Sequence, residues 1–415
     1  MSTHGGRATE CPVSMPVGRT RLVDPPTETV RLLEEQPICR VRLLNGESGW
    51  LTTNYELGKA VLADRRFTAA RIWGRQPVGE LERWLAEGVA EEGKPPHLNE
   101  ADPPFHTRRR RAIMSRLSFK RVQDTRDRVQ AIIDDCLDAL EQAGPPADFM
   151  EHFGTPVPGL VLSDLLGVPR QDREFFVDLT DRIRNPDSPA ADLAGDLRTW
   201  DEYVEGLVEY KGRNLGDDLV SDMIRDESTT HAEVVKDTIG VLQAGHETTT
   251  SQFGYGLFTL LHDISRWDAL KADPGSIDRV VEEMLRYNTI IEPNPTERTA
   301  LEDAEIGGAM ILAGETVIVS LLGANRDPSR FEAPDEFRPD RNDKGHMAFG
   351  GGIHLCAGQH VARLELTLGF TSLVRRFPDL RLAGDLEDIR WIRANAQTAG
   401  PLTLPVTWSH HTEEH

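Results

Sequence analysis

The sequence predicts a mainly helical fold with a small β region. Over most of the chain, apolar residues recur with the three- and four-residue spacing of amphipathic helices. One such segment, from His231 to about Asp263, is long enough to be the principal helix of the molecule. Strand-like runs are confined to two stretches, residues 41–53 and about 298–320.

The length and composition favour one large domain. The chain has 415 residues, of which 39% are hydrophobic and 28% are charged, as in ordinary globular proteins. It has no internal repeat and no long Gly/Ser-rich or Pro-rich linker. We therefore expect one folded domain over residues 26–408, after a polar, partly disordered segment 1–25 and before a C-terminal tail, 409–415.

The first stretch of the β region is a predicted hairpin. Strand-like runs around Val41 and Trp50 flank the dipeptide Asn45-Gly46, which favours a tight turn between antiparallel strands. Residues from about 71 to 104 have an irregular pattern between these elements and are interpreted as a functional loop region.

The principal helix has a clear start. Thr230 and Glu233 form a predicted capping box. About 30 residues at about 1.5 Å each would span roughly 45 Å, enough to cross the domain.

Midway, the sequence of this helix departs from helix preferences. Residues 244–251 read AGHETTTS, so a glycine stands beside a run of hydroxyl side chains that compete for backbone hydrogen bonds. Thr248 is predicted to donate to the carbonyl of Ala244, which would bend the helix and open a groove beside it. This conflict with helix preferences indicates a functional site.

Cys356 is the most informative residue of the chain. It lies in the run 349–358, FGGGIHLCAG, which fits the pattern F-G-x-G-x-H-x-C-x-G. The glycines would let the backbone approach a flat ligand closely. Because an apolar-periodic stretch begins near Val361, the sulfur should lie near a helix N-terminus, where N–H groups and the helix dipole favour a thiolate. A thiolate is an electron-donating axial ligand for haem iron.

Two other interpretations of Cys356 were weighed. With His354 and His346 it could form half of a zinc site, but no C-x-x-C or H-x-x-x-H pair elsewhere completes tetrahedral coordination. A buried structural cysteine would not explain the surrounding glycines.

Composition excludes several classes of protein. A net charge of −21 argues against a nucleic-acid binder. No run of about 18 apolar residues could span a membrane, and residues 1–25 lack the apolar core of a signal peptide, so we expect a cytoplasmic protein without a membrane partner. The four widely spaced cysteines are expected to be reduced.

The motifs at Cys356 and at residues 244–249 resemble those of the cytochrome P450 family, in its soluble bacterial (actinobacterial-type) class, and the resemblance covers about residues 30–408. It implies a helix-rich, single-domain fold shaped as a triangular prism. It also implies haem b as cofactor, with Cys356 as the axial ligand of the iron. Glu247 and Thr248 would be the catalytic pair that organises proton delivery during oxygen activation.

The resemblance assigns further residues to the haem and to the core behind it. The segment 102–111, DPPFHTRRRR, matches the family's D-P-P-x-H-T-x-x-R-R, and its His106 and Arg110, with Arg298 and His354, would bind the two haem propionates. The complete cofactor-binding set is His106, Arg110, Ala244, Gly245, Arg298, Phe349, Gly350, His354, Cys356 and Gly358. The structural set is Glu283, Arg286 and Arg341, from the family's E-x-x-R helix and the following meander.

The activity that the resemblance implies is monooxygenation, most often hydroxylation, of a small apolar molecule in natural-product biosynthesis, antibiotics included. Electrons would pass from NAD(P)H through a ferredoxin reductase and a ferredoxin, because the chain has no G-x-G-x-x-G motif after a predicted strand and no room for a flavin or iron–sulfur domain. Arg108, Arg109 and Arg111 would help dock this partner.

Two alternatives stay open. One is oxidative C–C or C–N coupling of aromatic or peptide-like natural products without oxygen insertion. The other is a non-catalytic haem sensor, which would not need Glu247 and Thr248. Positions expected to line the substrate pocket are Trp73, Leu242, Ile291, Glu292, Asn294, Asn395 and Gln397, within a mostly apolar surface.

Overall fold

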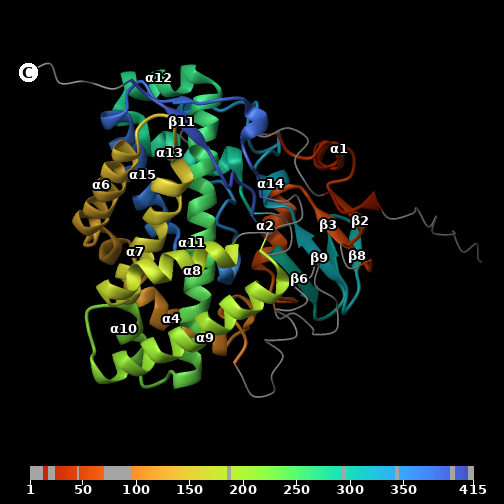
Figure 1. Ribbon diagram of the computed structural model, residues 1–415. Helices are drawn as coiled ribbons and strands as arrows, with labels where there is room; N and C mark the ends of the chain where they lie inside the picture. The colour runs from red at the N-terminus through yellow and green to blue at the C-terminus, as the bar shows by residue number, and fades with distance from the viewer. Residues whose placement is uncertain are drawn as a thin grey trace, which may run out of the picture.

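The computed structural model describes residues 13–16, 24–43, 46–69, 95–184, 188–291, 296–341, 345–392 and 398–409. Helices dominate, and the strands form small sheets, so the predicted fold class is confirmed (Figure 1). The helix α11 (His231–His262) runs through the middle of the molecule. On one side lie α6 (Arg126–Ala143), α7 (Pro156–Leu166) and α15 (Gln359–Arg376), and on the other lies the largest sheet (Figure 1).

The principal helix begins as the sequence predicts. Thr230 accepts from the backbone N–H of Glu233, and the Glu233 side chain accepts from the backbone N–H of Thr230, which completes the capping box. Further along, α11 approaches α13 (Ile277–Asn288) closely. A Cβ atom on Gly256 would lie 2.2 Å from the sulfur of Met284, so only glycine permits this contact.

The other helices surround this centre. They are α1 (Thr27–Glu35), α2 (Tyr55–Ala63), α4 (Phe105–Leu117), α5 (Phe119–Gln123), α8 (Arg173–Arg184), α9 (Ala190–Arg213), α10 (Leu219–Arg225), α12 (Ile264–Ala272) and α14 (Leu321–Ala324). Within the described ranges, none of the helices combines the length and the apolar character that a membrane crossing requires.

The largest sheet has the strand order β1-β2-β3-β9-β6-β4. Its strands are β1 (Val13–Ser14), β2 (Ile38–Arg42), β3 (Ser48–Thr52), β4 (Phe67–Thr68), β6 (Glu297–Ala300) and β9 (Thr316–Val319). The smaller sheets pair β7 (Ala304–Ile306) with β8 (Ala309–Ile311), and β11 (Pro405–Thr407) with both β5 (Ala147–Asp148) and β10 (Arg381–Leu382). Four of these strands, β6 to β9, lie within residues 297–319, so the second predicted strand-rich stretch, about 298–320, is confirmed.

The predicted hairpin is also confirmed. β2 and β3 pair antiparallel with Arg40 opposite Trp50, and Gly46 adopts a φ of 84° in the turn, whereas Asn45 lies outside the described residues. At the N-terminus, Val13 and Ser14 pair in parallel with β2, so this part of the segment expected to be partly disordered is a strand. Residues 1–12 and 17–23 lie outside the described part of the chain.

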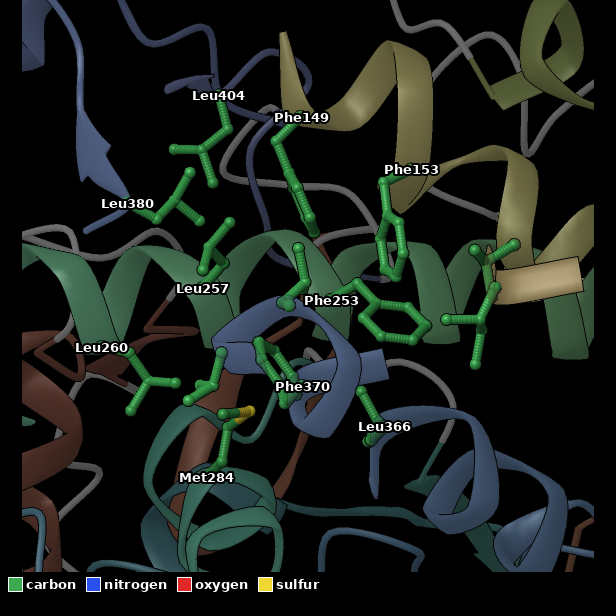
Figure 2. Close-up of a cluster of buried hydrophobic side chains, with 14 of the residues drawn as sticks. Phe149, Phe153, Phe253, Leu257, Leu260, Met284, Leu366, Phe370, Leu380 and Leu404 are labelled. Carbon is green, nitrogen blue, oxygen red and sulfur yellow. The ribbon is translucent and has the colours of Figure 1, made fainter. Parts of the chain in front are cut away.

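The largest hydrophobic cluster joins α11 to α15 (Figure 2). Phe253 of α11 packs edge-on against Phe153 of a π-helical turn, with ring centroids 5.5 Å apart, and contacts Phe370 of α15 at 5.7 Å. All three rings are fully buried. This packing fixes α15, and the cysteine loop that precedes it, relative to α11.

Candidate active site

The loop that carries Cys356 is built by backbone bonds and a close approach to α2. The Cys356 N–H donates to the carbonyl of Phe349 at 3.0 Å, and α15 begins at Gln359, so the sulfur lies near a helix N-terminus as predicted. Gly352 has a φ of 64°, and a Cβ atom there would lie 1.9 Å from the carbonyl oxygen of Leu62 in α2. At this position only glycine permits the contact with α2.

Two opposing effects act on the ionisation of the Cys356 thiol. Burial raises the pKa of the Cys356 thiol, and the N–H groups of Gly358 and Gln359 and the charge of Arg110 oppose this only in part. The helix N-terminal N–H groups thus favour the thiolate, as the sequence predicts, whereas burial without a bound cation favours the thiol. A cation bound to the sulfur would reverse the balance, because a thiol that coordinates a metal ion is deprotonated.

Four basic side chains from three separate parts of the sequence meet beside this loop. His106 comes from α4, and its ring centroid lies 4.4 Å from that of His354, two residues before the cysteine. Burial first, and then the neighbouring His106, Arg298 and Arg110, lower the pKa of His354 to about 3. Both ring nitrogens of His106 and Nε2 of His354 are buried and find no hydrogen-bond partner among the described residues.

The two arginines of this cluster lack acidic partners at close range. Arg298 is 7% exposed, and its Nη1 donates to the carbonyl of Glu297 at 2.8 Å. Arg110 donates to the carbonyl of Leu355, and burial lowers its pKa. Within the described ranges, no carboxylate forms a salt bridge with either arginine. Buried cations need anionic partners, so the cluster fits a ligand that carries carboxylates, such as the propionates of haem.

On α11, the predicted motif has the expected hydrogen bond. Thr248 Oγ1 donates to the carbonyl of Ala244 at 2.7 Å. The helix nevertheless continues without interruption from His231 to His262. Ala244 is exposed and Gly245 and Thr248 are half-buried, although the turns that follow on the same helix are fully buried. An accessible patch midway along a central helix indicates an open space beside it.

Glu247 makes a contact that our reading of the motif did not include. Its Oε1 accepts a hydrogen bond from the hydroxyl of Thr398, a residue from the segment that we expected to line the substrate pocket. Thr398 in turn forms an isolated antiparallel bridge with Ile291, which is half-buried. The structure therefore links one expected pocket position, Ile291, through Thr398 to Glu247, a member of the expected catalytic pair.

One expected pocket residue is corrected. Leu242 is fully buried in a hydrophobic cluster with residues of α4, α7, α8, α9 and α10, so it belongs to the core and does not face an open pocket. The pocket role of Leu242 is predicted only from its closeness to Ala244 in the sequence. The sequence does not show which helices pack against Leu242. The remaining pocket positions lie outside the described residues, namely Trp73, Glu292, Asn294, Asn395 and Gln397.

The structural set comes together as expected. Arg286 binds Glu283 through two hydrogen bonds, of 2.8 and 2.7 Å, and both side chains are buried. Arg341 Nε lies 3.6 Å from Glu283 Oε2. Arg286 also donates to the carbonyls of Asn325 and Pro334, each at 2.8 Å. The pair therefore fastens α13 to the segment that precedes the cysteine loop.

Two of the three arginines expected to dock a partner are engaged within the chain. Arg109 forms a fully buried ion pair with Asp237 of α11, where Nε donates to Oδ2 at 3.0 Å. Arg108 binds Glu233, and this contact is the main reason that the pKa of Glu233 falls to about 2. Only Arg111 of this group is exposed, which corrects our expectation for Arg108 and Arg109.

A second polar cluster behind the cysteine loop was missed by sequence reasoning. His346 contacts Glu282 at 3.0 Å, and Arg363 of α15 also donates to Glu282. Burial acts to raise the pKa of Glu282, but these two hydrogen bonds prevail and lower it to about 2. The Arg363 guanidinium lies 4.5 Å from the ring centroid of Phe349. The cluster therefore supports Phe349, whose carbonyl accepts the Cys356 N–H.

Comparison with known proteins identifies the family. The family model described as Cytochrome P450 matches residues 276–382. Cytochrome P450 105C1 from a Streptomyces species is 38% identical over 96% of this chain and 99% of its own length. Nocardicin C N-oxygenase from Nocardia uniformis subsp. tsuyamanensis is 39% identical over 91% of this chain and 94% of its own.

The solved structures agree. Cytochrome P450 MoxA from Nonomuraea recticatena matches with a TM-score of 0.88 at 36% identity, over 96% of this chain and 99% of that one. The resemblance read from the cysteine run and the α11 motif is thereby confirmed, and the cofactor of this family is haem. The chain belongs to the cytochrome P450 family and is, like its relatives, a monooxygenase.

Proposed function

We propose that the chain binds haem b through Cys356 and oxidises a small, mostly apolar natural product, with residues 26–408 as the catalytic domain. The observation that carries this proposal is the cluster beside the cysteine loop of the buried His106 and Arg298 and the half-buried Arg110 and His354, which lacks salt-bridging carboxylates within the described ranges. Haem bound there would supply the activation of dioxygen. The N-oxygenase among the relatives supports a substrate from natural-product biosynthesis.

The residues of this chain have separate tasks in the proposal. Cys356 supplies the sulfur ligand, and its loop is fastened by the bond from its N–H to Phe349. The four basic side chains hold the propionates and thereby fix the orientation of the cofactor. Glu247 and Thr248, on the accessible part of α11, hold and transfer the protons that oxygen activation consumes. The buried turns of α11 that follow limit the entry of water.

We further propose a ferredoxin, reduced by a ferredoxin reductase with NAD(P)H, as the electron donor. The surface near the cysteine loop combines exposed apolar side chains with positive charge. Phe119 of α5 is 62% exposed and packs on His360 of α15, and Ile353 in the loop itself is 47% exposed. Arg111 of α4 adds an exposed cation. Such a surface could bind a small acidic protein whose interface has apolar residues at its centre.

One experiment distinguishes monooxygenation from the alternative of oxidative coupling. Turnover with ¹⁸O₂, surrogate ferredoxin and reductase, and 7-ethoxycoumarin as the probe substrate is expected to place one ¹⁸O atom in the oxidised product or its released aldehyde. Absence of ¹⁸O from both the oxidised coumarin and the aldehyde, the aldehyde being reduced to its alcohol in situ before it exchanges oxygen with water, would contradict monooxygenation and favour coupling. No NAD(P)H consumption above that of the redox partners alone would contradict both.

Replacing Thr248 by alanine is expected to preserve haem content but to uncouple turnover. Without the hydroxyl, proton delivery fails and electrons leave as hydrogen peroxide, so product per NAD(P)H should fall by about tenfold or more. The measurement is the ratio of product and peroxide to NAD(P)H consumed.

The chain offers a matched control for this change. Thr238 lies on the same helix and donates in the same way to the carbonyl four residues earlier, Val234, at 2.7 Å. Thr238→Ala should therefore leave coupling unchanged, because Thr238 is fully buried and outside the site. Full coupling in Thr248→Ala, or equal uncoupling in both variants, would overturn the assigned role of Thr248.

A further inference from the structure

Glu247 is held by a neutral donor rather than by a cation. Its Oε1 accepts from the hydroxyl of Thr398, 151 residues further along the chain. Among the described residues, no arginine, lysine or histidine forms a salt bridge with Glu247, although ion pairs are frequent elsewhere on α11, as at Glu233 and Asp237. Within the part of the chain that the structure describes, one hydroxyl from another segment therefore orients this carboxylate.

The segment that carries Thr398 is rigidly placed. Thr398 is 3% exposed and bridges to Ile291, and the N–H of Ala399 donates to the carbonyl of Ile290 at 2.8 Å. A Cβ atom on Gly400 would lie 3.1 Å from Cα of Ser251, so the segment lies directly against α11.

This packing explains why the hydroxyl reaches Glu247. Ser251 and Glu247 are four residues apart and therefore share a face of α11. Gly400 packs at Ser251, and Thr398 lies two residues earlier, next to Glu247. The donor is thus fixed by backbone contacts on both sides, while the Glu247 side chain, which is half-buried, has rotatable bonds and would otherwise sample several orientations.

We propose that Thr398 is a positioning residue, whose hydroxyl holds the Glu247 carboxylate in the one orientation from which it delivers protons. The proposal rests on the proton role assigned to Glu247 above. A hydrogen bond to an ionised group is stronger than one between neutral groups, so one hydroxyl suffices to select an orientation. Thr398 also joins this carboxylate to Ile291, so the wall of the site and the proton donor are held by the same residue.

The test uses the holoprotein with three substitutions and one control. Thr398→Val keeps the branched shape but cannot donate, whereas Thr398→Ser keeps the hydroxyl. Glu247→Gln removes the acid but can still accept from Thr398. The control is Thr403→Val, in the same segment, whose hydroxyl accepts from the N–H of Arg390 at 3.1 Å and, among the described residues, has no hydrogen bond to Glu247.

Three readouts are combined. The first is the crystal structure of the Thr398→Val holoprotein, in which the Glu247 side chain should leave the orientation seen here. The second is product per NAD(P)H with 7-ethoxycoumarin, which should fall severalfold in Thr398→Val and stay at the parent value in Thr398→Ser and Thr403→Val. The dissociation constant for the probe, measured from the shift of the Soret band, should stay within about twofold in all variants. In the double variant Glu247→Gln/Thr398→Val, coupling should equal that of Glu247→Gln alone.

The outcomes separate this proposal from the one on which it rests. If Glu247→Gln uncouples turnover but Thr398→Val does not, or if Glu247 keeps its orientation in the Thr398→Val crystal structure, the positioning role is overturned and the proton role of Glu247 stands. An additive loss in the double variant would also overturn it, because Thr398 would then act independently of Glu247. Full coupling in Glu247→Gln would overturn the proton role itself, and the proposal for Thr398 with it.

Discussion

Replacing Glu283 by alanine is expected to lower the free energy of unfolding by about 3–5 kcal/mol, the usual cost of removing one partner of a buried ion pair. Arg286 has no exposed side-chain surface, so its charge would be left in the interior without its carboxylate. The backbone N–H of Arg338, which donates to Glu283 at 2.7 Å, would also lose its acceptor. Because stabilities of folded proteins are about 5–15 kcal/mol, this loss is a large fraction of the total, and we expect less folded holoprotein to accumulate than for the parent.

The measurement is haem content per chain and the midpoint of thermal unfolding. The control is Glu209→Ala, which removes an exposed pair with Arg213 at 3.5 Å on α9 and should change neither quantity measurably. A Glu283→Ala protein with the midpoint and haem content of the parent would show that this pair does not hold α13 to the segment before the cysteine loop.

Replacing Glu365 by glutamine is expected to stabilise the protein at neutral and alkaline pH. Glu365 lies in α15 and is 2% exposed, and burial raises its pKa from 4.5 to about 8. The folded chain therefore keeps a proton that the unfolded chain releases above pH 4.5. The stability that comes from binding this proton is present in full below pH 4.5. As the pH rises from 4.5 to about 8, the free energy of unfolding therefore declines. The difference between the pKa values of the unfolded and folded chain, at about 1.4 kcal/mol per pH unit, corresponds to a loss of about 5 kcal/mol in the free energy of unfolding at pH 8.

Thermal unfolding of both proteins between pH 5 and pH 8 measures this effect. The advantage of Glu365→Gln should grow steadily with pH, because glutamine does not ionise. Glu387→Gln makes the same change at an exposed position and should follow the parent protein at every pH. A constant difference between Glu365→Gln and the parent across this range would mean that Glu365 is not protonated in the folded chain.

The fold could be predicted wherever the signal is local. The capping box at Thr230 and the Asn45-Gly46 turn act over a few residues, and the long helix and the hairpin follow from them. The basic cluster is different, because His106, Arg298 and His354 come from three distant segments, and only the resemblance to a family indicated that they would meet.

The predictions that failed depend on packing between elements. Arg109 was expected at the surface because no local feature reveals that α4 places it against Asp237 of α11. Leu242 was assigned to the pocket without knowledge of the helices that bury it. For Cys356, the helix N-terminus was predicted from the sequence and is present, whereas the burial that opposes ionisation of the unligated thiol depends on packing that the sequence does not show.

The most direct test of the central assignment is the visible spectrum of the dithionite-reduced protein with carbon monoxide. We predict the strongly red-shifted Soret band of a thiolate-ligated haem, lost in Cys356→Ser. Cys136→Ser is the matched control, because Cys136 is a free, buried cysteine of α6, and this variant should keep the band. A protein without haem, or one whose freshly prepared carbon monoxide complex shows only the band of histidine ligation, would contradict the assignment of Cys356 as the iron ligand.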